Sequence, residues 1–560
     1  MTPAITARAD LLPAYDVVVL GGGLAGLTLA LQLLQQRPET RILVIEKKAH
    51  PVDEAAHKVG ESSVEIGAHY FTRVLGQLEH FRKDQLPKLG LRYFFDADDP
   101  MDITTRTELG GNTFFETESF QIDRGRFENH LGVEALAAGA HFVHGAVVRE
   151  VTLAERAGTH SVTFSPPGAA EGDTVRVDAR WVVDASGRSS LLKRKLGLQK
   201  KNGHDANATW WRYDKRLKVD DFSDDPGWTN RIGGKRQRWL STVHFCGAGY
   251  WLWFIPLASG SHSVGIVVDA DLHPFGTIAS YEKSMAWIRK FEPQAAAYLD
   301  QVIADGAQLQ DFLALKDFSY SCTQLYDNNR WALTGEAGAF LDPFYSPGSD
   351  YIGISNTLIT DLVVRDLAGE RIGARANVYN RIFFNFYDSH LTLYEGQMHM
   401  NGNAKVMTLK IIWDFAYYWV MPAAFFFHGR LTDMMLFSER KAELDRAGDI
   451  NLAVQQLFRE WHKAGIKVAP VFVNMAGMPF MRELNRGLKD PLDRDQFLAR
   501  LGTGLASLDQ LASEIFGEAQ RDVPGIESPV LAALGERPVT ILDTVLPVLQ
   551  RRPAPGPDAG

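Results

Sequence analysis

A glycine-rich turn between two short apolar runs is the feature that most constrains the fold. Residues 16–20 and 41–46 are rich in β-branched side chains, which is typical of buried parallel strands. A Gly-x-Gly-x-x-Gly turn follows the first run, and residues 27–36 then place leucines on one helical face. The order strand, turn, helix, strand predicts a βαβ unit.

The same segment predicts a dinucleotide site, with a bare glycine-rich turn as the alternative. Glycines here let the backbone approach a pyrophosphate at a helix N-terminus, where unpaired N–H groups favour an anion. Glu46 ends the second run, at the position where an acidic residue holds a ribose hydroxyl. The residues assigned to this part of the site are Gly21, Gly23, Leu24, Ala25, Gly26, Glu46 and Lys47.

Composition excludes several classes of protein. The net charge of −9 argues against a nucleic-acid partner, which requires a basic face. Two cysteines are too few for a disulfide framework or a zinc site, so we expect no metal site and a cytoplasmic location. The N-terminus shows no signal peptide. Asp414 and Pro422 interrupt the apolar stretch 411–427, which predicts a buried helical hairpin or an apolar lid, with membrane-surface contact less favoured.

Further patterns divide the 560 residues into several segments. Residues 142–151 and 174–183 predict strands, residues 239–268 an antiparallel sheet, and residues from about 358 to 549 mostly helices. The expected segments are a flexible N-terminus (1–14), two parts of a nucleotide-binding domain (15–95 and 96–200), a sheet region (201–325), a second site segment (326–370), a helical region (371–550) and a disordered tail (551–560).

Two distant segments resemble the later FAD motifs of p-hydroxybenzoate-hydroxylase-like flavoproteins. One runs from Trp181 to Arg188 through an Asp-Ala-Ser-Gly turn, and the other from Trp331 to Pro343. The resemblance implies an α/β fold with a Rossmann-type FAD domain, an antiparallel sheet for the substrate and a helical C-terminal region. The cofactor residues it adds are Asp184, Ser186, Gly187, Gly335, Glu336 (where the class usually has Asp), Pro343, Arg124 from the segment 121–124, and Val147 through its backbone.

Four further segments resemble the flavin-dependent halogenases. They are the Trp-x-Trp-x-Ile-Pro string at 251–256, Lys58-Val59-Gly60-Glu61-Ser62, the Lys-x-Gly segment at 86–94, and the turn at 344–349. Tyr345 stands where the tryptophan halogenases carry a glutamate, so the phenol and pyrrole branches are favoured. The substrate expected is an electron-rich aromatic (phenolic, pyrrole- or indole-like, or aryl-polyene-like), free or tethered to a carrier protein.

The resemblance assigns a role to each segment. FAD, as FADH2, reacts with O2 and chloride or bromide to give hypohalous acid. The halide lies near Ser346, Pro347, Gly348 and Ser349, with Gly348 also near the flavin, although Pro347 has no N–H to offer. Lys88, in apolar surroundings that favour a neutral amine, steers the halogenating species. Trp251 and Trp253 shield the flavin, Ser62 lies beside it, and Glu61 assists the lysine or the flavin.

Other interpretations remain open from the sequence. No second glycine-rich βαβ turn is evident, so a separate NAD(P)H:flavin reductase is expected. An FAD-dependent aromatic monooxygenase of the same fold is the main alternative, followed by a non-enzymatic flavoprotein that binds a pigment or lipid precursor, and by a reductase of isoprenoid chains. For Arg124 the alternative is a surface salt bridge, and for the aromatic residues around 413–427 it is the core. The oligomeric state is unknown.

Overall fold

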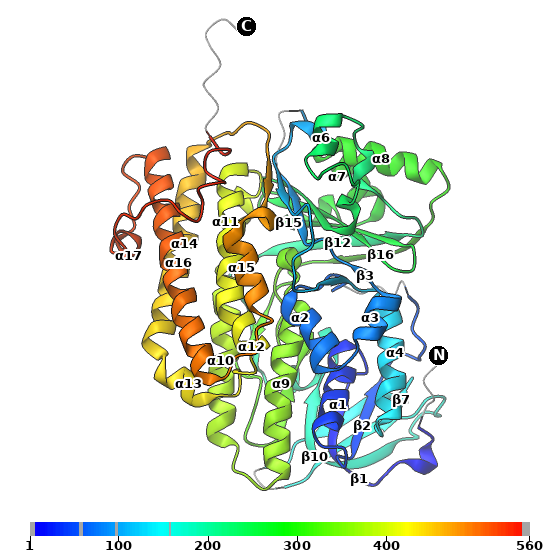
Figure 1. Cartoon of the computed structure of the whole chain (residues 1–560). Coiled ribbons are helices and arrows are strands. Elements are labelled where there is room, and N and C mark those ends of the chain that lie inside the picture. Colours follow the sequence, from blue (N-terminus) through cyan, green and yellow to red (C-terminus); the bar gives the residue numbers. More distant parts are fainter. Residues whose placement is uncertain (1–5, 55–59, 96–98, 156–157, 551–560) are drawn as a thin grey trace, which may run out of the picture.

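Two β-sheets and a set of C-terminal helices organise the computed structural model, which describes residues 6–54, 60–95, 99–155 and 158–550 (Figure 1). The first sheet has the order β7-β2-β1-β10-β9-β8, and β18 also pairs with β10. Its strands are β1 (Ala14–Leu20), β2 (Ile42–Glu46), β7 (His141–His144), β8 (Val147–Thr152), β9 (His160–Ser165), β10 (Val175–Asp184) and β18 (Trp331–Leu333). Strands β7, β2, β1, β10 and β18 run parallel, whereas β8, β9 and β10 pair antiparallel.

The predicted βαβ unit is present as β1, α1 (Leu24–Gln36) and β2. Every residue of α1 from Leu24 to Leu34 is buried. The helix packs against the sheet and against two other helices, α4 (Arg124–Ala137) and α9 (Gly348–Leu367) (Figure 1). The helices that complete this half are α2 (Glu65–His69), α3 (Leu78–Asp84) and α5 (Leu191–Lys195). A Rossmann-type layer is therefore the scaffold of the N-terminal half.

The second sheet has the order β16-β12-β15-β14-β13-β4-β5-β19. Its strands are β4 (Leu91–Phe94), β5 (Glu108–Gly110), β12 (Ala206–Tyr213), β13 (Thr242–Gly247), β14 (Tyr250–Pro256), β15 (His262–Asp269), β16 (Leu309–Leu315) and β19 (Phe472–Asn474). Strands β13, β14 and β15 are the predicted antiparallel strands, but the sheet as a whole is mixed, because β4 pairs parallel to β13 and β19 parallel to β5. Two small ladders join β3 (Leu86–Pro87) to β6 (Phe120–Gln121), and β11 (Gln199–Lys200) to β17 (Ser321–Cys322).

Strand β14 divides its side chains between two cores. Leu252 and Phe254 pack into the cluster under α6 (Pro226–Asn230), α7 (Tyr281–Phe291) and α8 (Pro293–Ala304). Trp251 and Trp253 pack into the main cluster on the other face, which includes the C-terminal helices. The period of two along a strand thus sends both tryptophans to the same side.

The C-terminal half is mainly a bundle of helices against both sheets (Figure 1). Its elements after α9 are α10 (Gly373–Leu391), α11 (Ala404–Tyr418), α12 (Ala424–Phe427), α13 (Met434–Glu439), α14 (Lys441–Trp461), α15 (Pro479–Gly487), α16 (Arg494–Asp522) and α17 (Pro529–Ala532). Within the described ranges, none of these helices combines the length and apolar character that a membrane span requires.

Several sequence-based expectations were wrong in detail. Residues 411–427 form one continuous helical run rather than a hairpin, since a π-helical turn at Trp419–Ala423 accommodates Pro422, which has no N–H to donate. Residues 142–151 form two strands rather than one, β7 and β8. The last described helix ends at Ala532, well before 549.

The expected flexible N-terminus is tied down where it is described. The Thr6 N–H donates to the Phe142 carbonyl at 2.9 Å, and the Phe142 N–H donates to Thr6 Oγ1 at 2.8 Å. Residues 1–5 and the expected disordered tail, 551–560, lie outside the described residues.

Candidate active site

The glycine-rich turn has the shape that a pyrophosphate requires. A Cβ on Gly21, whose φ is +115°, would fall 2.4 Å from the Ala185 carbonyl oxygen, and one on Gly26 would fall 1.9 Å from the Gly21 oxygen. At Gly23, by contrast, no described atom lies within 4 Å of that position. No side chain caps the N-terminus of α1, so its first N–H groups face this open space. The turn therefore fits a dinucleotide.

Glu46 holds the turn through two backbone amides. Its Oε2 accepts from the Gly22 N–H at 2.7 Å, and its Oε1 accepts from the Lys48 N–H at 2.6 Å. Lys47 is exposed beside it. Contact of this carboxylate with a ribose stays a prediction.

The two later motifs converge on the same edge of the sheet. Asp184 is fully buried at the end of β10, where it accepts from the Ser186 N–H at 3.0 Å and the Leu192 N–H at 2.7 Å. Its carboxylate therefore shapes the turn that contains Gly187. Gly335, with φ +59°, lies so close to α1 that its Cβ would be 3.0 Å from the Ala25 Cβ.

The remaining predicted cofactor residues surround this edge. Glu336 is half-buried and forms an ion pair with Arg188 at 3.1 Å. Arg124 begins α4 and pairs with Glu128 at 2.8 Å; burial lowers the pKa of Arg124 to about 10, although Glu336 and Glu61 oppose the shift. Val147 is half-buried at the start of β8, and Pro343 is half-buried at the start of the turn before α9.

Lys88 is a buried lysine held by two oxygen acceptors. Its Nζ donates to Ser62 Oγ at 2.8 Å and to the Ser63 carbonyl at 2.7 Å. Burial lowers the pKa of Lys88 to about 7, against the opposing effect of the Glu65 and Asp350 carboxylates. A substantial fraction of this amine is therefore neutral near pH 7.

The predicted halide turn meets the lysine at one hydroxyl group. Ser346 has a left-handed φ of +58°, and its Oγ donates to Ser62 Oγ at 3.0 Å. Pro347 then forms the N-cap of α9, without a side-chain cap, and Gly348 has open space at its Cβ position. Ser349 is buried in the first turn of the same helix. Ser62 thus links residues that are far apart in the sequence.

Glu61, which was expected to assist the lysine or the flavin, is paired with an arginine. Glu61 accepts from Arg212 Nε at 2.7 Å, and its pKa is raised by burial although Arg212 lowers it. Its carboxylate contacts the arginine rather than the lysine. Lys58 and Val59, from the same motif, lie outside the described residues.

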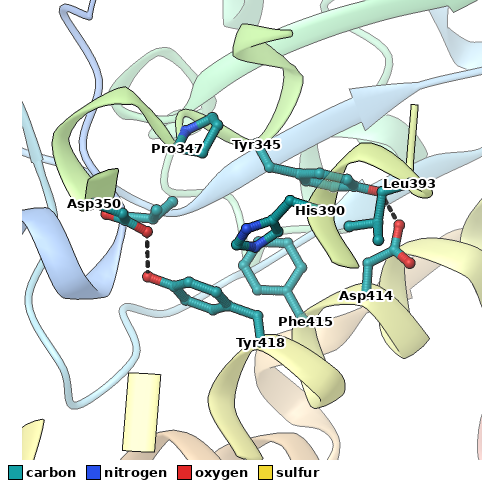
Figure 2. Close-up of a pocket in the computed structure, with 9 residues that line it drawn as sticks. Tyr345, Pro347, Asp350, His390, Leu393, Asp414, Phe415 and Tyr418 are labelled. Carbon is teal, nitrogen blue, oxygen red and sulfur yellow. Dashed lines mark hydrogen bonds between the residues drawn. The ribbon is translucent and has the colours of Figure 1, made fainter. Parts of the chain in front are cut away.

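Glu65 and Asp350 are the acidic residues whose charges act on Lys88, and the sequence interpretation missed both. Asp350 Oδ1 accepts from the Gly67 N–H at 2.8 Å and Oδ2 from the Tyr418 hydroxyl at 2.6 Å (Figure 2). Burial raises the pKa of Asp350 to about 7 and also raises that of Glu65. The only signal in the sequence is that each acid follows a predicted site motif by a few residues.

A cavity of about 300 Å³ lies on the lysine side of this junction. Aromatic and apolar side chains form most of its wall, as in a site for a ring-shaped ligand. Its lining residues are Val64, Glu65, Pro87, Lys88, Gly90, Leu91, Phe114, Phe115, Thr117, Glu118, Ser119, Phe120, Phe415 and Met475.

A second, narrow cavity adjoins the Ser346 turn, and Figure 2 shows the side chains that surround it. Val64 and Phe415 line both cavities, so the two are neighbours. Tyr345 donates its hydroxyl to Asp414 at 2.5 Å, and His390 extends between Tyr345 and Tyr418. Of the C-terminal aromatic residues, only a few reach these cavities, while Trp413 and Phe425 are fully buried in the core.

The paired tryptophans pack against the turn that precedes Ser346. The ring centroids of Trp251 and Trp253 are 5.4 Å apart, with an interplanar angle of 38°. Trp251 also lies 5.4 Å from Phe344, edge to face. Trp253 donates Nε1–H to Ser263 Oγ at 3.1 Å, which fixes its ring on the neighbouring strand.

The nucleotide cradle, together with a second sheet and a buried lysine in the segment that leads into its strand β4, defines a flavoprotein of the p-hydroxybenzoate-hydroxylase-like class. The chain is 26% identical over 442 residues to the flavin-dependent halogenase chlA of Dictyostelium discoideum, which covers 73% of this chain and 70% of that protein. It is 27% identical over 363 residues to the 1H-pyrrole-2-carbonyl-(peptidyl-carrier protein) chlorinase of Pseudomonas fluorescens, covering 60% and 72%. These relatives are flavin-dependent halogenases, and the chain is an enzyme similar to them.

Solved structures share the fold. Halogenase PltM in complex with phloroglucinol and FAD matches with a TM-score of 0.64 at 16% identity, over 90% of this chain and 96% of that one. The flavin-dependent brominase Bmp2 matches with a TM-score of 0.54 at 19% identity, over 80% and 98%. The family described as "Lycopene cyclase protein" matches residues 16–224, a segment that ends before the paired tryptophans.

Proposed function

We propose that the chain is an FADH2-dependent halogenase of an electron-rich aromatic ring. The observation that carries this proposal is the junction at Ser62, where the buried Lys88 and the Ser346 turn meet beside an aromatic-lined cavity. A monooxygenase of the same fold has no need for a lysine in this position, because it transfers oxygen directly from the flavin side.

FAD fits the cradle formed by the glycine turn and the two later motifs. When bound in reduced form, it supplies, with O2 and a halide, the hypohalous acid that carries the halogen. The residues proposed to hold it are Gly21, Gly23, Leu24, Ala25, Gly26, Glu46, Lys47, Arg124, Val147, Asp184, Ser186, Gly187, Gly335, Glu336, Pro343 and Gly348.

Halide binds, in this proposal, at the N-terminus of α9. The N–H groups of Gly348 and Ser349 lie in the first turn, where unpaired amides and the helix dipole favour an anion. Pro347 offers no N–H and the Ser346 hydroxyl donates its proton to Ser62, so the amides beyond the proline are the donors that remain. Chloride and bromide both suit such a site.

Lys88 then directs the halogenating species into the cavity. A lysine with a pKa of about 7 exposes a neutral amine at physiological pH, which a solvated lysine does not. The carboxylates of Glu65 and Asp350 assist the lysine, because their charges act on its amine. Trp251 and Trp253, on β14 of the second sheet, shield the flavin from the substrate, so oxygen is not transferred directly.

The substrate proposed is a phenol or a pyrrole-like ring, free or tethered to a carrier protein. Tyr345 occupies the place of the glutamate of tryptophan halogenases, and the relatives include a chlorinase named for a carrier-bound pyrrole. A cavity of about 300 Å³ with an aromatic wall suits one such ring. Reduced flavin comes from a separate NAD(P)H:flavin reductase.

The test is a bromination assay with purified protein, FAD, a flavin reductase, NADH, O2 and bromide, over a panel of phenols, pyrroles and indoles. Mass spectra are searched for the bromine isotope doublet with wild type, Lys88→Ala and the control Lys83→Ala, which removes an exposed lysine in α3. A doublet lost only in Lys88→Ala supports the proposal. A product heavier by one oxygen, formed equally without bromide, would make the chain a hydroxylase.

A further inference from the structure

The geometry around Lys88 Nζ fixes the direction of its bonds. Two oxygen acceptors lie at hydrogen-bond distance, Ser62 Oγ at 2.8 Å and the Ser63 carbonyl at 2.7 Å. The carbonyl has no proton, so it always accepts. No third hydrogen-bond partner of Nζ is present among the described residues, and Lys88 lines the larger cavity.

The hydroxyl of Ser62 is saturated, which makes it an acceptor toward the lysine. A hydroxyl offers one donor and two acceptor sites. Lys88 and Ser346 donate to the two acceptor sites, and Thr242 Oγ1, at 2.8 Å, is the partner left for the Ser62 proton. Thr242 is itself held by the side-chain amide of Gln121 at 3.0 Å.

We propose that Ser62 is a positioning residue which, with the Ser63 carbonyl, aims the Lys88 amine at the cavity. A neutral amine has two N–H bonds and one lone pair. Both N–H bonds are used by the two oxygens, so the lone pair takes the remaining direction of the tetrahedral nitrogen. Ser62 was expected, by resemblance, to lie beside the flavin; its hydroxyl is instead occupied by Lys88, Ser346 and Thr242.

This inference rests on the proposed function and is tested with a matched pair of variants. Ser62→Ala removes the acceptor. Ser284→Ala is the control: it removes a comparable buried hydroxyl in α7, away from the site, which donates to the Ile278 carbonyl at 2.8 Å. Three readouts are compared: acetic-anhydride labelling of Lys88 against pH in flavin-free protein, the Kd for FAD, and brominated product per O2 consumed.

The expected result is specific to Ser62→Ala. Loss of a hydrogen bond to the charged amine lowers the midpoint of Lys88 labelling by about one pH unit. Product per O2 falls at least about fivefold, since an unaimed amine loses much of the advantage of orientation. The Kd for FAD stays within about twofold, and Ser284→Ala resembles wild type in all three readouts.

Two results would overturn the inference. One is equal behaviour of Ser62→Ala and Ser284→Ala; the other is a tenfold weaker Kd for FAD in Ser62→Ala with unchanged Lys88 labelling, which would make Ser62 a flavin contact. If Ser62→Ala does not fold, Thr242→Val takes its place. It removes the acceptor of the Ser62 proton, so that Ser62 can donate to the lone pair of Lys88, and the same falls in labelling midpoint and in product per O2 are expected. Labelling needs no halogenation, so failure of the proposed function would appear separately, as absence of product from wild type.

Discussion

Gly265→Ala is expected to displace Trp253 and to destabilise the second sheet. Gly265 pairs with Trp253 across β14 and β15, and the indole ring lies over the glycine. A Cβ at position 265 would fall 2.1 Å from the nearest indole carbon. Carbon atoms need about 3.5 Å, so the ring must retreat by about 1.4 Å.

The ring has little room to retreat. Trp251 packs on one side, and the indole N–H is bonded to Ser263 Oγ at 3.1 Å. Overpacking costs about 1–3 kcal/mol, and a buried donor that loses its acceptor costs about 1–3 kcal/mol more. We therefore expect the free energy of unfolding to fall by about 2–6 kcal/mol.

Urea denaturation followed by tryptophan fluorescence measures this loss. Gly502→Ala is the control, because Gly502 is exposed in α16 with no neighbour near its Cβ position, and alanine there favours the helix by up to about 1 kcal/mol. The Kd for FAD should stay within about threefold, since the cradle lies on the other sheet. A Gly265→Ala protein as stable as wild type, with unchanged fluorescence, would refute the placement of the indole.

Three further predictions concern charge. Asp350→Asn removes a carboxylate that raises the pKa of Lys88, so the pKa of Lys88 should fall below its wild-type value of about 7. In a pH–rate profile, the limb on which halogenation rises with pH should therefore move to lower pH by about one unit. Glu46→Ala releases the Gly22 and Lys48 amides and should weaken FAD binding about tenfold in a fluorescence titration, while leaving Lys88 labelling unchanged. Glu108→Gln breaks a fully buried ion pair with Arg92 and Arg238 and should cost about 3–5 kcal/mol in urea denaturation. Burial raises the pKa of Glu108, but the two arginines lower it overall. The extra stability of wild type over Glu108→Gln should therefore be present above the pKa that Glu108 has in the unfolded chain, and should be lost as the pH falls through its pKa in the folded protein.

Local pattern was sufficient for the elements that carry the cofactor motifs. Each short β-branched run forms a strand, and α1 begins at the glycine turn. These features depend only on residues close together in the sequence. The pairing of Trp251 with Trp253 on one face follows likewise from strand periodicity. The hairpin expected at 411–427 failed because a proline inside a helix was taken as a break, whereas a π-helical turn accommodates it.

The contacts within the site could not be derived in the same way. Glu61 was expected to assist the lysine or the flavin, and in the structure its carboxylate pairs with Arg212 on β12, a strand of the second sheet. The charges that act on the lysine come from Glu65 and Asp350, on two different helices. Nothing in the local sequence indicates which buried acid faces which buried base, because that depends on how helices pack on the sheets.

The sequence by itself determined the nucleotide-binding unit, the strand that carries both tryptophans, and the residue types of the site. These follow from hydrophobic period and from the geometry that glycine allows. Only the tertiary structure decided that Lys88 and Ser346 both donate to the Ser62 hydroxyl, and that β19, from the C-terminal part of the chain, completes the second sheet. The contact of Ser346 with Ser62 and the pairing of β19 with β5 join segments hundreds of residues apart, and their geometry is set by the packing of whole layers against one another.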